Sequence, residues 1–138
     1  MMHWSLQYIG KPYEVCARGP ERFDCFGLLW HIYSNVYAID LGEFLGITAS
    51  PLAKQCAALE GSVSSDDWVE VETPFDGCAV AMGQRKVLHH VGIYLAADGG
   101  KILHADKPMV VAATLKRLKM HGFKTIRFYR HKLWPTSS

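Results

Sequence analysis

Three features that mark common protein classes are missing from this 138-residue sequence. No apolar run approaches the roughly 20 residues that a membrane-spanning helix needs, so we expect no membrane partner. The 15 Lys and Arg residues nearly balance the 13 Asp and Glu residues, and a formal net charge of +2 argues against a nucleic-acid partner. The first seven residues contain neither a basic leader nor a long apolar stretch, so we expect no signal peptide and synthesis in the cytoplasm.

The four cysteines also lack the spacing of a metal or redox motif. Cys16, Cys25, Cys56 and Cys78 contain no Cys-x-x-Cys pair. Cys56 and Cys78 have small or aliphatic neighbours, which favours a place in the core. Because the chain shows no leader, a disulfide framework is not expected. We also expect no metal and no cofactor.

The apolar pattern predicts one α+β domain over residues 1–138, with helices first and strands after them. A helix is predicted over 25–38 with Asp24 as its N-cap, and a second over 51–59. Residues 112–120 fit a short helix or an irregular crossover equally well. A turn at residues 98–100 predicts that 87–105 form a hairpin. The helices should pack on a central antiparallel sheet of about five strands, at 68–71, 78–82, 87–95, 101–105 and 123–130.

Cys25 is the candidate nucleophile. It falls in the first turn of the predicted helix, where free backbone N–H groups and the helix dipole favour a thiolate. A cysteine in such a place is expected to have a lowered pKa, most strongly with a histidine nearby. The same N–H groups would stabilise an oxyanion. On helix position alone, a buried packing cysteine explains the residue equally well.

Two histidines are placed to act on this cysteine. Strand alternation puts His90 and Gly92 on one face and His89 on the other. His104 falls in the partner strand of the hairpin, where it would orient His90 while His90 activates Cys25. A one-residue shift of register would exchange His89 for His90.

A zinc site is the competing interpretation of the same region. His89, His90, His104 and Cys78 all carry suitable ligand atoms. Neighbouring residues of a strand point to opposite faces, so His89 and His90 do not easily bind one ion. Nucleophilic catalysis is therefore the favoured hypothesis.

Four blocks of the sequence, in order, resemble the NlpC family of papain-like cell-wall cysteine peptidases. They are YIGKPY (8–13), GPERFDCFGLL (19–29), HVGIY (90–94) and ILHA (102–105). The resemblance implies a papain-like fold with Cys25 as nucleophile, His90 as general base and His104 as the orienting residue. Tyr13 and Asp24 match positions that line the substrate site in such enzymes. The implied activity is that of a cysteine peptidase or amidase acting on the stem peptide of peptidoglycan.

Phe26 departs from the family pattern, in which a small serine follows the nucleophile. We therefore count Phe26 among the substrate-binding residues, as one that alters the pocket. An aromatic residue here, together with Tyr129-Arg130 near the end of the chain, is similar to the branch carried by phages and prophages as tail-tip proteins. That similarity implies other phage tail proteins as partners and a place in the tail or virion. The alternative is a structural tail-assembly component on the same scaffold, with weak or no hydrolase activity.

Overall fold

The structure, a computed structural model, describes residues 3–41, 68–84 and 88–134. The predicted helix at 51–59, Cys56 and the start of the predicted strand at 87 lie outside the described residues. None of the described helices is long and apolar enough to cross a membrane. The elements, in chain order, are η1 (Trp4–Gln7), α1 (Cys25–Val36), β1 (Trp68–Val71), β2 (Ala79–Gly83), β3 (His90–Leu95), η2 (Ala97–Gly99), β4 (Lys101–Asp106), β5 (Met109–Ala113), α3 (Leu115–Met120) and β6 (Thr125–His131).

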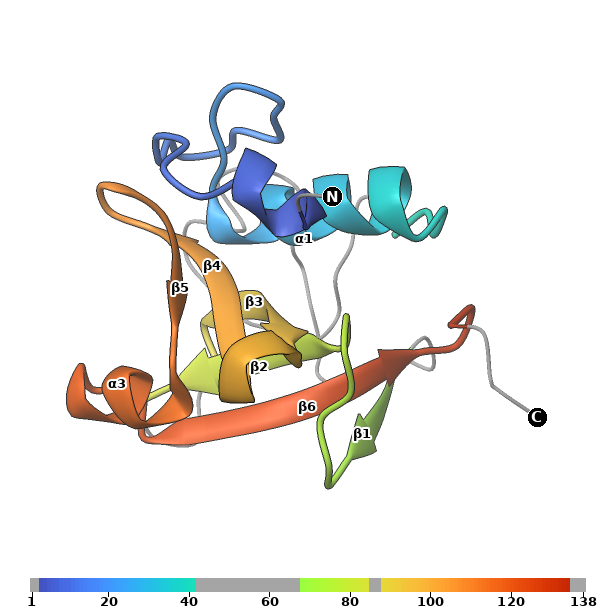
Figure 1. The fold of residues 1–138 in the computed structure, drawn as a ribbon, viewed down its shortest axis with the longest axis vertical. Coiled ribbons are helices and arrows are strands. Elements are labelled where there is room, and N and C mark those ends of the chain that lie inside the picture. Colours follow the sequence, from blue (N-terminus) through green and yellow to red (C-terminus); the bar gives the residue numbers. More distant parts are fainter. Residues whose placement is uncertain (1–2, 42–67, 85–87, 135–138) are drawn as a thin grey trace.

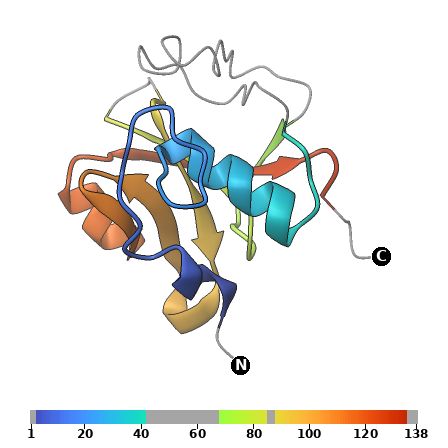
Figure 2. The ribbon, with the colours of Figure 1, turned by 90° about the horizontal axis from the view of Figure 1, so that it is seen from above.

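The strands form a six-stranded antiparallel sheet in the order β1-β6-β2-β3-β4-β5. Helix α1 crosses one face of this sheet, where it contacts β3 and β4, and α3 lies at the far end of the sheet (Figures 1 and 2). The predicted α+β class and papain-like architecture are confirmed. The sheet has one strand more than the five expected from the sequence.

Helix α1 begins where the sequence predicts. The Asp24 side chain caps it, because its Oδ1 atom accepts a hydrogen bond of 2.6 Å from the N–H of Gly27. The helix ends at Val36, slightly before the predicted end, because Ala38 takes a left-handed conformation with φ of 57°. Its buried face contributes large apolar side chains to the main core, among them Leu28, Leu29, Ile32 and Tyr33.

The two faces of β3 divide as the alternation predicts. Val91, Ile93 and Leu95 join the main core on the α1 side of the sheet. Tyr94 packs instead with a smaller core on the opposite side, where Leu118 of α3 is buried. The hairpin of β3 and β4 is confirmed, with η2 at its turn.

Strand β5 is the element that sequence analysis missed. It pairs with β4 along its whole length, and Thr114 then caps α3 by accepting a hydrogen bond of 3.2 Å from the N–H of Arg117. The ambiguous segment 112–120 is therefore the end of a strand followed by a short helix. Six-residue helices show too few turns for periodicity to identify them.

The state of Cys16 differs from what the sequence predicts. Cys16 is disulfide-bonded, so the prediction that disulfides are absent is wrong. Pairing depends on which residues the fold brings within bonding distance, and sequence spacing does not reveal this. Cys78 is free and fully buried, as predicted.

Gly27 provides a test of how the first turn of α1 is packed. A Cβ atom there would collide with the carbonyl oxygen of Ala17, a backbone atom that cannot move away cheaply. Replacing a helical glycine by alanine ordinarily stabilises by about 1 kcal/mol. We expect Gly27→Ala instead to lower the free energy of unfolding by about 1–3 kcal/mol, because of overpacking, in urea denaturation. Ser34→Ala, at an exposed position of the same helix, is the matched control; a Gly27→Ala protein as stable as this control would contradict the packing described.

Candidate active site

Cys25 is the first residue of α1 and lies against the start of β3. The backbone N–H groups of Val91 and Phe26 lie near its thiol and favour the ionised form. The residue is free and partly exposed. The sulfur therefore sits where the helix N-terminus meets the strand that carries His90.

The resting state of this thiol differs from the expectation. Burial, and after it the nearby charge of Asp24, raise the pKa of Cys25 to about 12, although the two backbone N–H groups oppose the shift. The prediction of a lowered pKa is therefore wrong for the free protein. The helix terminus does favour a thiolate, but desolvation and the neighbouring carboxylate outweigh it.

His90 and His104 form a buried hydrogen-bonded pair. The Nε2 atom of His90 lies 2.8 Å from the Nδ1 atom of His104, and the two rings are nearly perpendicular. The bonded residue is His90 rather than His89, so the register predicted for this strand is confirmed. The bond uses Nε2 of His90 and leaves its Nδ1 atom for another partner.

The strands around the pair hold both rings in place. The ring of His90 stacks on Phe123, with centroids 5.2 Å apart and planes 19° from parallel. A Cβ atom at Gly92 would stand 2.8 Å from the carbonyl oxygen of Leu103 and 3.1 Å from Cβ of His104, so only glycine permits this approach of the strands. The glycine noted in the sequence thus makes room for the neighbouring strand.

Burial also decides the charge of the histidines. It lowers the pKa of His90 well below 6.5, and the neighbouring imidazoles of His104 and His89 lower it further. It lowers the pKa of His104 too, although the carboxylate of Asp106 opposes that shift. Both rings are therefore neutral near pH 7, and neutral imidazole is the form that acts as a base.

Tyr13 lies close enough to Cys25 for the two groups to interact electrostatically. Burial raises the pKa of its hydroxyl to about 12, and the charges of Cys25, Asp24 and Asp106 contribute in that order. The phenol therefore keeps its proton over the working pH range. A protonated hydroxyl at this place is a hydrogen-bond donor near the sulfur.

Asp24 joins two backbone segments. While Oδ1 caps α1, Oδ2 accepts a hydrogen bond of 2.9 Å from the N–H of Cys16, which has a left-handed φ of 67°. Both oxygens of the carboxylate are thus engaged by backbone groups. This geometry positions Cys25 relative to the preceding loop.

Phe26 is buried, with 2% of its surface exposed. The guanidinium of Arg18 lies over its ring at 5.2 Å and over the ring of Trp30 at 5.5 Å. Phe26 therefore offers almost no surface for direct contact with a ligand, because it is buried and its ring lies under Arg18. The sequence analysis did not single out this arginine.

Asp106 is a second residue that the sequence analysis missed. One ligand atom from each of His90, His104 and Asp106 lies within 4.8 Å of the other two. Asp106 follows His104 by two residues in β4, and strand alternation could have placed it on the same face. This group does not include His89 or Cys78, so the four proposed zinc ligands are not brought together among the described residues.

A helix N-terminus bearing a cysteine, packed on an antiparallel sheet bearing a histidine pair, defines the papain-like class of cysteine peptidases. The sequence matches the NlpC/P60 family over residues 10–128, and the chain belongs to that family. The family consists of cysteine peptidases and amidases. The fold is similar to that of the NlpC/p60 domain of the peptidoglycan hydrolase SagA, with a TM-score of 0.59, 21% identity, and coverage of 90% of this chain and 91% of the other. No curated protein sequence matches this chain.

The charge of Asp24 gives a test of the site's electrostatics. Asn retains an N-cap oxygen but carries no charge, so Asp24→Asn should lower the pKa of the Cys25 thiol and keep α1 capped. At pH 8 we expect Cys25 to be alkylated by iodoacetamide about two- to tenfold faster in this variant, since each pKa unit changes the thiolate fraction tenfold. Mass spectrometry would follow the rate at each cysteine, with Cys78 as the internal control. An unchanged rate at Cys25 would show that Asp24 does not set its pKa.

Proposed function

We propose that this protein is a cysteine peptidase or amidase that hydrolyses an amide bond in the stem peptide of bacterial peptidoglycan. Cys25 is the nucleophile, His90 the general base and His104 the residue that orients His90. The observation that carries the proposal is the buried hydrogen bond between His90 and His104, on the strand whose Val91 backbone lies near the thiol of a cysteine at a helix N-terminus. The family and the fold shared with SagA, itself described as a peptidoglycan hydrolase, support the choice of substrate.

The reaction begins with a neutral thiol at Cys25 and a neutral imidazole at His90. The proton of the Cys25 thiol passes to Nδ1 of His90 as the sulfur attacks the amide carbonyl carbon. The carbonyl oxygen becomes an oxyanion that accepts hydrogen bonds from the backbone N–H of Cys25 and the hydroxyl of Tyr13. The imidazolium of His90 then protonates the leaving amine, the C–N bond breaks and a thioester remains.

Water completes the cycle. His90 removes a proton from the water as its oxygen attacks the thioester carbonyl, and the C–S bond breaks. The imidazolium of His90 returns its proton to the departing sulfur, so the products are a carboxylic acid and the regenerated thiol. Whenever His90 is neutral in this mechanism, its Nε2–H donates to Nδ1 of His104, which leaves Nδ1 of His90 unprotonated and ready to act as the base.

The pH dependence follows from the lowered pKa of His90. A base must be unprotonated, so activity is lost as pH falls through the pKa of the folded protein. Because burial lowers that pKa below 6.5, the acid side of the kcat/KM profile should have its midpoint below pH 6.5. The profile would be measured with purified peptidoglycan or a wall peptide. A midpoint at or above 6.5 would show that His90 is not held neutral.

Single variants separate the assigned roles. Cys25→Ala should abolish hydrolysis, and His90→Ala should reduce kcat/KM by about 10²–10⁴, the usual contribution of a general base. His104→Ala should cause a smaller loss, because His90 remains but is less well oriented. His89→Ala is the matched control and should retain most activity. Release of wall peptides, followed by mass spectrometry, is the measurement; a large loss in His89→Ala with activity retained in His90→Ala would reverse the assignment.

Association with a phage or prophage tail is the finer part of the proposal. It is supported by Phe26 after the nucleophile and by Tyr129-Arg130. A structural tail component with weak or no activity is the second candidate, and the raised pKa of Cys25 favours it because a neutral thiol is a poor nucleophile. Hydrolysis of wall peptide that is lost in Cys25→Ala would support the peptidase and reject the purely structural component.

A further inference from the structure

Three side chains that can bind a metal ion meet on the strands β3 and β4. One ligand atom from each of His90, His104 and Asp106 lies within 4.8 Å of the other two. His90 comes from β3, whereas His104 and Asp106 are two residues apart in β4 and share one face of that strand. Imidazole nitrogens and carboxylate oxygens are ligands of zinc in proteins, and three such ligands are enough for a zinc site with one open position.

The distances within this group are close to those of a zinc site. Zn–N and Zn–O bonds of about 2.0–2.2 Å place the ligand atoms of a tetrahedral site about 3.3 Å apart. Nε2 of His90 and Nδ1 of His104 are 2.8 Å apart, so the two atoms need to separate by only about 0.5 Å to bind one ion. Asp106 is exposed, so rotation of its side chain can bring an oxygen to the same ion.

The two histidines are held in place by their surroundings, while the carboxylate has an oxygen to spare. Phe123 stacks on the ring of His90 and meets the ring of His104 edge-on, with centroids 6.4 Å apart. An apolar neighbour of this kind fixes the orientation of metal ligands and limits water around them. Oδ1 of Asp106 accepts a hydrogen bond of 2.9 Å from the N–H of Lys107, whereas Oδ2 accepts none from a described residue.

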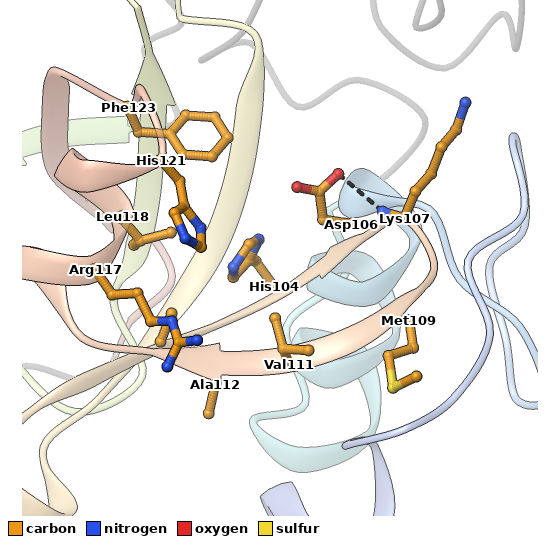
Figure 3. Close-up of a pocket in the computed structure, with 11 residues that line it drawn as sticks. His104, Asp106, Lys107, Met109, Val111, Ala112, Arg117, Leu118, His121 and Phe123 are labelled. Carbon is orange, nitrogen blue, oxygen red and sulfur yellow. Dashed lines mark hydrogen bonds between the residues drawn. The ribbon is translucent and has the colours of Figure 1, made fainter.

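A cavity of about 480 Å³ gives an ion access to these ligands. His104 and Asp106 line it from β4, and His121 and Arg117 line it from the α3 side (Figure 3). The cavity has room for a water molecule as the fourth ligand, as in other zinc sites with three protein ligands. Arg117 and Lys107, which also lines the cavity, carry positive charges that oppose a cation. They weaken the binding and so favour reversible occupation.

We propose that His90, His104 and Asp106 form an inhibitory zinc site, in which the ion takes the place of the hydrogen bond between the two histidines. Zinc binds the lone pairs of Nε2 of His90 and Nδ1 of His104, and Asp106 supplies an oxygen. A neutral His90 with zinc on Nε2 carries its proton on Nδ1, the atom that receives the thiol proton in the proposed mechanism. No proton leaves the pair, but His90 can no longer act as the base. The inhibition rests on the proposed function, whereas zinc binding is separable from hydrolysis.

Equilibrium binding of zinc to the full chain carrying Cys25→Ala tests the site without the reactive thiol. Isothermal titration calorimetry with zinc chloride should show binding of one ion per chain. Magnesium and calcium, which prefer oxygen ligands, should not compete with zinc. Loss of zinc binding in Cys25→Ala would show that the thiol binds the ion, and would overturn the proposal. Equally tight binding of calcium would overturn it too.

Variants of the three ligands assign the site. In the Cys25→Ala background, Asp106→Asn should raise the Kd for zinc at least 10- to 100-fold, because the loss of even an outer-shell partner has this effect. Asp106 is exposed, so this variant leaves the core intact. His104→Gln should weaken binding by a similar factor, with circular dichroism to show that it is folded.

The matched controls are Glu72→Gln, which removes an exposed acid outside the group, and His89→Ala, which removes an imidazole outside it. Both controls should bind zinc like the parent. Equal Kd values for Asp106→Asn and Glu72→Gln would overturn the assignment.

Hydrolysis of wall peptide by the protein with Cys25 intact distinguishes this proposal from the general one. Zinc should inhibit hydrolysis, a chelator should restore it, and the inhibiting concentration should rise in Asp106→Asn by the same factor as the Kd. Zinc binding by a protein that hydrolyses nothing without zinc would reject the peptidase and the inhibition but retain the metal site. Hydrolysis that continues when zinc saturates the site would retain the peptidase and overturn the inhibitory role.

Discussion

The carboxylate of Asp24 is the constraint on which the arrangement of the site depends. It accepts one backbone N–H from the first turn of α1 and another from the loop at Cys16, so a single side chain connects the helix start to the loop before it. Cys25 is the next residue, so this junction fixes the position of its backbone. Its sulfur then lies near the backbone of Val91 in β3. The same charge also raises the pKa of the thiol, so the carboxylate that positions Cys25 also disfavours its ionisation.

Burial shifts the pKa of the cysteine and the pKa of the histidine in opposite directions, and both shifts favour the neutral form of the group. Desolvation disfavours a thiolate at Cys25 and an imidazolium at His90. In the proposed mechanism, a neutral thiol and a neutral base therefore begin the reaction, and the proton moves from sulfur to nitrogen only during the attack on the substrate. Such a site is protected from stray alkylation and oxidation, since these reactions need the thiolate.

Much of this arrangement was predictable because it depends on neighbours in the sequence. An N-cap carboxylate, a helical apolar face and the alternation that separates His90 from His89 are local patterns, and the structure confirms each of them. The motifs around Cys25, His90 and His104 likewise predicted the family. Strand β5 and helix α3 were not predictable in the same way, because β5 is defined by its pairing with β4 and α3 is too short for a periodic signal.

The sequence by itself determined the family, the main helix and the order of the proposed catalytic residues, since these follow from residue type and short-range spacing. Only the tertiary structure decided the ionisation of Cys25, the disulfide of Cys16 and the meeting of Asp106 and Arg117 at one cavity. Each of these depends on distances between segments far apart in the chain. Desolvation, bonding distance and shared burial arise only when those segments pack together, and no local pattern encodes them.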